Sequence, residues 1–167
     1  MNLKKPLFLF ALCLAFAAPA FGGVAQFTGR VITVADGDTI TVLTSDKRQV
    51  KIRLYGVDCP EYGQAFGARA KQATLDAAHR KKVTVQPMDT DNYGRTVAIV
   101  IMPGGRSLNE HLVREGMAWV YTRYCTQEEI CGPLRKLEQA AKGQRRGLWA
   151  DRAPLPPWEW RIGHQRF

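Results

Sequence analysis

The fold is decided by the stretch VAQFTGRVITVADGDTITVLTSDKRQVKIRLYGV, residues 24–57. It is dense in β-branched residues that alternate with polar ones, which is the period of a half-buried strand. The candidate strands are residues 30–34, 39–42 and 50–54. An Asp-Gly turn at 36–37 and a Ser-Asp-Lys turn at 45–47 separate them. The stretch therefore predicts three strands in an antiparallel meander.

Helical spacing replaces this alternation between residues 64 and 79, which predicts a helix of about four turns. Its expected apolar stripe is Phe66, Ala70, Ala73 and Ala77. Strand character returns at residues 82–85 and 96–101, which are joined by a polar turn at 91–94. These residues predict a second hairpin.

Two more helices are predicted before the composition changes. Ser107 and Glu110 form a capping box that opens the first, and Gly116 is expected to end it. Pro133 is expected to open the second. Its expected apolar stripe is Leu134, Leu137 and Ala141. This order of elements is typical of an OB-fold, so we expect an α+β protein with a five-stranded antiparallel β-barrel and three helices.

The beginning of the chain has the pattern of a secretory signal peptide. Lys4 and Lys5 precede an apolar run at 6–17, and Ala-Pro-Ala at 18–20 fits a cleavage site. A retained membrane anchor is the alternative, but the run is shorter than the roughly 18 to 20 residues that span a bilayer. We expect an exported protein, periplasmic or extracellular. The expected organisation is a signal peptide over 1–20, a globular domain over 21–152 and a Pro/Trp-rich basic tail over 153–167.

The composition is that of a basic globular protein. Hydrophobic residues make up 46% and charged residues 23%, which excludes a disordered or fibrous chain and fits one domain. The 24 Lys and Arg residues exceed the 15 Asp and Glu residues, so a polyanion such as nucleic acid is the expected partner. A membrane-surface protein is the alternative, but the alanine stripe at 64–79 is typical of a core. We expect a monomer with no stable membrane insertion.

Three acidic residues stand near the predicted strand ends. Asp38 follows the first turn, Asp58 follows the third strand, and Glu61 comes in the next loop. Each alone is typical of a turn or loop, but a hairpin could bring Asp38 and Asp58 to one end of the barrel, where oxygen ligands suit Ca²⁺ or Mg²⁺. Arg53 and Arg95 add two guanidinium groups, which are usually solvated on a strand but match the oxygens of a phosphate.

Three segments carry a resemblance to a known family. They are DGDT at 36–39, IRLYGVDCPE at 52–61 and DNYGR at 91–95. They resemble, in the same order, the signature segments of the thermonuclease (micrococcal-nuclease-like) family, and the similarity extends over about residues 24–149. The resemblance implies an OB-fold nuclease that uses Ca²⁺ to hydrolyse DNA and RNA and leaves 3′-phosphate ends.

The resemblance also implies a metal site. Asp38 and Asp58 would hold Ca²⁺ together with the main-chain carbonyl of Cys59, and Asp36 would lie near the metal. Cys59 stands where the best-known member has threonine, which keeps the carbonyl but removes a hydroxyl.

Catalytic roles follow from the same segments. Glu61 would orient or deprotonate the attacking water, and Arg53 and Arg95 would bind the phosphate and stabilise its transition-state charge. Tyr93 would contact the nucleotide. The alternative is a non-catalytic OB-fold module that binds single-stranded nucleic acid, but such a module is expected to have lost at least one of these charged residues.

The remaining predictions concern the cysteines and the tail. Cys125 and Cys131 are close in sequence within a loop, so we expect them to form a disulfide and leave Cys59, at the metal end of the barrel, as a free thiol. The tail has no counterpart in the best-known member of the family. Its residues Arg152, Trp158, Trp160, Arg161 and Arg166 could contact bases and phosphates or pack on the barrel, and we favour packing along an extended path.

Overall fold

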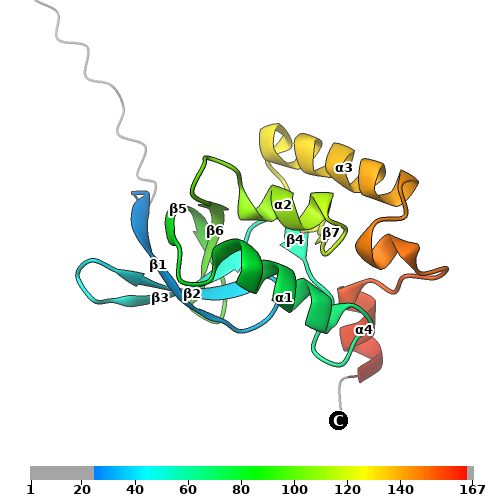
Figure 1. Cartoon of the computed structure of the whole chain (residues 1–167), viewed down its shortest axis with the longest axis horizontal. Coiled ribbons are helices and arrows are strands. Elements are labelled where there is room, and N and C mark those ends of the chain that lie inside the picture. The colour runs from blue at the N-terminus through cyan, green and yellow to red at the C-terminus, as the bar shows by residue number, and fades with distance from the viewer. Residues whose placement is uncertain (1–24, 165–167) are drawn as a thin grey trace, which may run out of the picture.

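A closed five-stranded barrel forms one side of the molecule, and helices lie beside it (Figure 1). We describe it from a computed structural model, in which residues 25–164 are described. The predicted signal peptide and Arg166 lie outside the described residues. The strands are β1 (Phe27–Val34), β2 (Thr39–Thr44), β3 (Gln49–Leu54), β5 (Lys82–Thr90) and β6 (Thr96–Ile101), in the order β1-β2-β3-β6-β5.

The predicted meander and second hairpin are both present in the barrel. β1 pairs with β2, β2 with β3, and β5 with β6 and β1, all antiparallel. The barrel is not antiparallel throughout, because β3 pairs with β6 in parallel and places Arg53 opposite Val97. The reason is the crossover between them, since α1 (Gly67–Ala78) and β5 return the chain to the end of the barrel from which β3 started.

The alternation in the sequence fills the interior of the barrel. Inward positions of every strand are buried, and α1 and α2 (Leu108–Arg114) pack against the same core (Figure 1). The fully buried strand residues include Val31, Ile40, Val42, Ile52, Leu54, Val83, Val85 and Val100. The α+β OB-type barrel expected from the sequence is therefore confirmed.

The helices agree with the sequence prediction in part. α1 buries Gly67, Ala70, Thr74 and Ala78, so its most buried stripe is offset by one residue from Ala73 and Ala77, which are only partly buried. α2 has the expected cap, with the Glu110 N–H donating to the Ser107 hydroxyl.

The prediction that Pro133 opens the next helix was wrong. α3 (Glu128–Gly143) begins five residues earlier, and Pro133 lies inside it. Two glutamates in the first turn favour this earlier start, because they complement the positive end of the helix dipole. Pro133 and Glu129 are both exposed, so water can satisfy the Glu129 carbonyl that Pro133 leaves without a donor.

The prediction that the tail is extended was wrong, because part of it forms a helix. The described residues therefore contain four α-helices instead of the three expected. The tail forms α4 (Pro157–His164) after the 3₁₀ turn η1 (Gly147–Ala150). Pro157 is the first residue of the helix, where a missing N–H costs no hydrogen bond. The favoured packing is present for Trp158, whose ring stacks on Tyr121 at a centroid distance of 4.9 Å, whereas Trp160 stacks on His164 within α4.

Two short connections complete the fold beside the barrel. β4 (Val57–Asp58) pairs with β7 (Trp119–Val120), which fixes the segment after β3 against the helical side of the molecule. Cys125 and Cys131 form a disulfide and Cys59 is a buried free thiol, as expected from the sequence. Within residues 25–164, no helix combines the length and apolar character needed to cross a membrane.

Candidate active site

The turn between β1 and β2 brings the first aspartates to the site because Gly37 allows a very close approach. A Cβ built on Gly37 would lie 2.6 Å from the Cys59 Cβ and 2.9 Å from the Ala70 Cβ. The Thr74 hydroxyl on α1 donates to the Gly37 carbonyl at 2.5 Å. The turn is thus pressed between α1 and the segment after β4, which places Asp38 beside Asp58.

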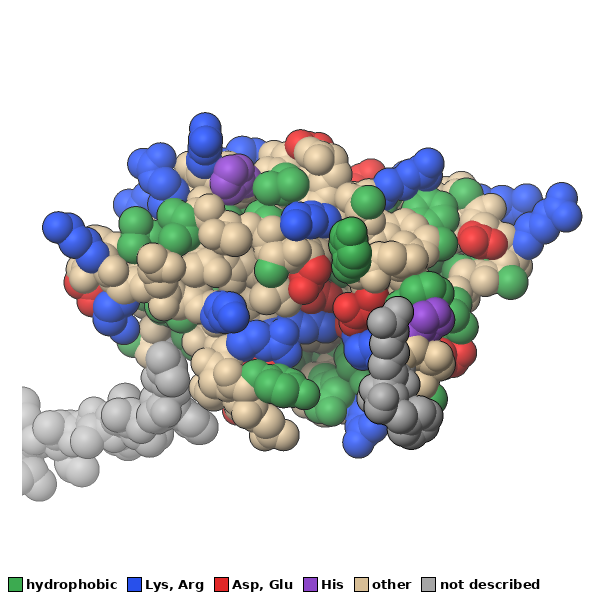
Figure 2. Space-filling view, turned by 90° about the horizontal axis from the view of Figure 1, so that it is seen from below, with side chains coloured by type: hydrophobic (Ala, Val, Ile, Leu, Met, Phe, Trp, Pro, Cys, Tyr) green, Lys and Arg blue, Asp and Glu red, His purple; other side chains and the backbone are tan. Residues whose placement is uncertain are grey.

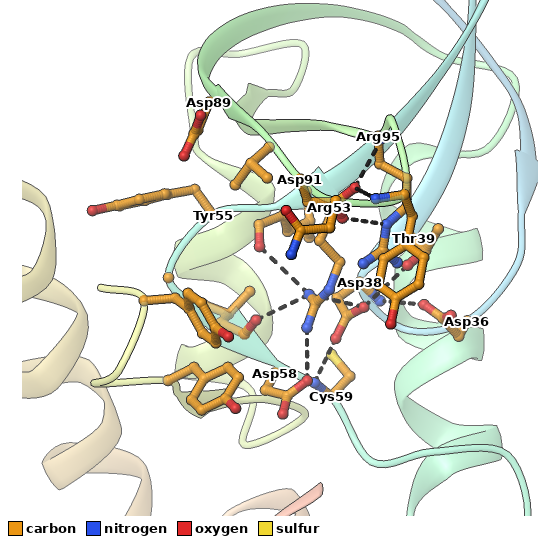
Figure 3. Close-up of a pocket in the computed structure, with 18 of the residues that line it drawn as sticks. Asp36, Asp38, Thr39, Arg53, Tyr55, Asp58, Cys59, Asp89, Asp91 and Arg95 are labelled. Carbon is orange, nitrogen blue, oxygen red and sulfur yellow. Dashed lines mark hydrogen bonds and ion pairs between the residues drawn. The ribbon is translucent and has the colours of Figure 1, made fainter. Parts of the chain in front are cut away.

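Arg53 is the centre of the site. It extends from β3 between the two aspartates, with its guanidinium 2.9 Å from Asp38 Oδ1 and 2.6 Å from Asp58 Oδ1 (Figure 3). It also donates to the Val57 carbonyl at 3.0 Å. The side chain of Asp58 is 1% exposed and that of Asp38 is 7% exposed, so both carboxylates are buried against one cation.

Asp38 also holds the main chain at Cys59. The Cys59 N–H donates to Asp38 Oδ2 at 2.6 Å, and the Asp38 N–H donates to Asp36 Oδ1 at 3.0 Å. Burial raises the pKa of the Cys59 thiol, so this cysteine stays protonated and is poorly suited to act as a nucleophile.

Burial also dominates the titration of Asp38. Desolvation raises the pKa of this carboxyl to about 7, although Arg53 opposes the shift and Asp36 and Asp58 add to it. The opposite balance holds at Arg53, whose pKa rises despite burial because Asp38 and Asp58 lie beside it. Asp38 therefore gains or loses its charge near neutral pH, while Arg53 stays charged.

Glu61 lies at the start of the loop into α1. A Cβ on Gly67 would come within 2.0 Å of the Glu61 carbonyl oxygen, so only glycine lets the first turn of α1 pack on this loop. The Glu61 N–H donates to the Gln64 side chain at 2.9 Å. These contacts fix the main chain, while the Glu61 carboxylate is about one third exposed and accepts a hydrogen bond from Arg161.

Arg95 approaches the site from the β5–β6 turn. Its Nε lies 2.6 Å from Asp91 Oδ2, and its N–H donates to Asp91 Oδ1 at 2.9 Å. Burial opposes ionisation of Asp91, but these hydrogen bonds from Arg95 prevail and lower its pKa. Tyr93 is 85% exposed at the tip of this turn, with its ring 5.5 Å from the Arg95 guanidinium carbon.

The charged side chains described above line one cleft of about 580 Å³ at the end of the barrel. The cleft is lined by all of the metal, catalytic and substrate residues predicted from the sequence, which are Asp36, Asp38, Arg53, Asp58, Cys59, Glu61, Tyr93 and Arg95. Figure 2 shows Lys and Arg side chains scattered over one face of the molecule, with Asp and Glu side chains among them near its middle. The cleft therefore combines buried carboxylates with guanidinium groups inside a basic protein.

Two residues of the site were not assigned to it from the sequence. Asp91 was quoted only as part of a motif, although its four-residue spacing from Arg95 around a turn could have suggested the pair. Arg161 was weighed only as a tail residue, yet it reaches the cleft from α4 and pairs with Asp58 and Glu61.

The donor chemistry of the cleft fits a hard cation. Asp38 and Asp58 offer carboxylate oxygens, the donors that Ca²⁺ prefers, and Glu61 lies next to Asp58 through their shared partner Arg161. In the described part of the chain, no three His, Cys, Asp or Glu side chains converge closely enough to form a ready-made ion site. Two arginines instead neutralise these carboxylates.

Comparisons with known proteins agree with this site. The family described as "Staphylococcal nuclease homologue" matches residues 51–151. A micrococcal nuclease of Shigella flexneri is 39% identical over 159 residues, covering 90% of this chain and 88% of that protein. Protein ParB of Escherichia coli is 41% identical over 156 residues, covering 89% and 85%. The chain therefore belongs to the staphylococcal nuclease family of phosphodiester hydrolases.

Proposed function

We propose that this protein is a Ca²⁺-dependent nuclease that cleaves both DNA and RNA and leaves 3′-phosphate ends. The observation that carries the proposal is the meeting of three carboxylates with two arginines in one cleft. These residues are Asp38, Asp58, Glu61, Arg53 and Arg95. A non-catalytic binding module would need only the basic surface, and nothing would require it to bury two carboxylates beside Arg53.

The cation would be held by Asp38, Asp58 and the main-chain carbonyl of Cys59. The Asp36 carboxylate would support this site by accepting a hydrogen bond from the Asp38 backbone N–H. When bound, Ca²⁺ supplies positive charge that polarises a phosphoryl oxygen. This assignment leaves Glu61 outside the ligand set, with its carboxylate about one third exposed to the cleft.

Glu61 would orient the attacking water and accept its proton, a step for which a positioned carboxylate is suited. Arg53 and Arg95 would hold the phosphate by donating to its oxygens and would oppose the negative charge that grows in the transition state. Arg53 is fixed by Asp38 and Asp58, and Arg95 by Asp91, so both guanidinium groups are held in place before substrate arrives. Tyr93, exposed beside Arg95, would contact the nucleotide.

The test is digestion of plasmid DNA and of RNA by residues 21–167 in Ca²⁺, in Mg²⁺ and in excess chelator, with end-group analysis of the products. We expect cleavage of both nucleic acids in Ca²⁺, 3′-phosphate termini, and no cleavage in chelator. Undiminished hydrolysis in chelator would contradict the cation assignment. Retention of nucleic acid without cleavage in any buffer would favour the binding module.

We propose further that the protein works outside the cytoplasm. The signal-peptide pattern of residues 1–20 supports export, and so does the Cys125–Cys131 disulfide, because such bonds persist in oxidising compartments. The mass of the protein recovered from periplasm and from culture medium tests this proposal. We expect a chain that starts after Ala20, and recovery of the full-length chain from the cytoplasm alone would contradict it.

A further inference from the structure

Arg161 extends from α4 into the cleft and binds two of its carboxylates at once. Its Nη2 lies 2.8 Å from Asp58 Oδ2, and its Nη1 lies 3.2 Å from Asp58 Oδ1 and 2.5 Å from Glu61 Oε1. The pKa of Arg161 is raised, despite the opposing effect of burial, by these hydrogen bonds. One guanidinium therefore bridges the residue proposed to hold the cation and the residue proposed to handle the proton.

Asp58 has no carboxylate oxygen left without a guanidinium partner. Arg53 donates to Oδ1 at 2.6 Å, and Arg161 donates to Oδ2. The Asp58 side chain is 1% exposed, so these two arginines supply the compensation that a buried charge requires. A cation that takes an oxygen of Asp58 must compete with Arg161, the more exposed of the two partners.

α4 is held on the domain by contacts separate from those of Arg161. Trp158 stacks on Tyr121 and meets the Trp119 ring edge-on at 5.7 Å. The Gln64 side chain donates to the Leu155 carbonyl at 2.7 Å. Figure 1 shows α4 as a separate helix at the chain's end, and it lies beyond the residues 51–151 that match the family. These contacts fall on β7, Tyr121 and the loop before α1, outside the strands of the barrel.

We propose that Arg161 is an internal counter-cation for the nuclease site and that docking of α4 competes with binding of Ca²⁺. With α4 docked, the Arg161 guanidinium is bound to the carboxylate oxygens of Asp58 that the cation would take. With Ca²⁺ bound, the contacts of Arg161 with Asp58 are lost and the docking of α4 is weakened. This inference rests on the proposed cation site and adds a regulatory element to it.

Competition has two measurable consequences. The apparent affinity for Ca²⁺ equals the intrinsic affinity multiplied by the fraction of molecules in which α4 is undocked, so weakening the docking must tighten Ca²⁺ binding. By linkage, Ca²⁺ must loosen α4 to the same degree. A residue that only stabilised the fold would change neither quantity in this direction.

The experiment is calorimetric titration of the whole chain with CaCl₂ alone, in the absence of nucleic acid. Arg161→Gln removes the competing charge, and Trp158→Ala weakens docking while leaving Arg161 in place. Both should lower the Kd for Ca²⁺ by about fivefold or more, which corresponds to ~1 kcal/mol. Arg152→Gln removes the same charge from an exposed position in the same tail and should leave the Kd unchanged.

The reciprocal readout is trypsin cleavage after Arg161, followed by mass spectrometry. Ca²⁺ should accelerate this cut in the wild-type protein, although a bound ion normally protects a protein from proteolysis. If Arg161→Gln and Trp158→Ala bind Ca²⁺ no tighter than wild type, or if Ca²⁺ slows the cut, the competition is wrong and the proposed nuclease site stands. If no form binds Ca²⁺, the cation site and the competition fail together.

Discussion

Replacing Arg53 with methionine should destabilise the protein in a way that depends on pH. The change keeps an apolar stem of similar length but removes the charge between Asp38 and Asp58. Removing one partner of a buried ion pair costs about 3 to 5 kcal/mol, because a charge is left uncompensated. Asp58 keeps Arg161 and Asp38 keeps the Cys59 N–H, so we expect the lower end, about 3 kcal/mol at pH 8.

The stability lost in Arg53→Met should become smaller as the pH falls. Asp38 has a pKa of about 7 in the folded protein, so at pH 5 it is already largely protonated and gains little from Arg53. The difference in unfolding free energy between wild type and Arg53→Met should therefore be smaller at pH 5 than at pH 8 by about 1 kcal/mol or more. Urea denaturation in chelator, followed by tryptophan fluorescence, measures this difference at both values.

Arg48→Met is the matched control. Arg48 pairs with Asp46 at 2.6 Å, but both side chains are more than half exposed, so the loss should stay below about 1 kcal/mol at either pH. If Arg53→Met costs no more than this control, or if its cost is the same at pH 5 and pH 8, the buried charge network described here is wrong.

Three further predictions address the site and the tail. Arg95→Ala should lower kcat by about 10² or more with unchanged circular dichroism, and near wild-type turnover would exclude a role in transition-state charge. The Kd for Ca²⁺ should weaken about fivefold from pH 7 to pH 6, because only ionised Asp38 can hold the cation and its pKa is about 7. A flat profile in calorimetry would contradict this. Deleting residues 153–167 should lower Tm by about 5 °C while KM changes little, because Trp158 packs on Tyr121, and the reverse result would make the tail a substrate arm.

The barrel could be predicted because its information is local. Alternation over residues 30–54 dictates which side chains face inward, and the turns at 36–37 and 45–47 separate the strands. The parallel pairing of β3 with β6 could not be derived in this way. It depends on how the connection of about forty residues between β3 and β6 closes the barrel. The alternation within each strand carries no information about that connection.

The site was predictable to the extent that its residues lie in short motifs on strand ends. Asp38, Asp58 and Glu61 were grouped correctly because the meander brings their segments together. Arg161 could not be placed, since it lies 103 residues from Asp58 and its helix follows a proline-rich stretch that predicts an extended path. Helix formation there relies on packing of Trp158 against Tyr121 and Trp119, which only tertiary structure supplies.

The central claim is that this cleft hydrolyses phosphodiester bonds with Glu61 handling the proton of the attacking water. The most direct test is the steady-state rate of DNA cleavage in saturating Ca²⁺ by Glu61→Gln, beside Glu129→Gln at an exposed position in the first turn of α3. We predict that Glu61→Gln lowers kcat by about 10² to 10⁴ and that Glu129→Gln leaves it unchanged. Near wild-type turnover by folded Glu61→Gln would contradict the account.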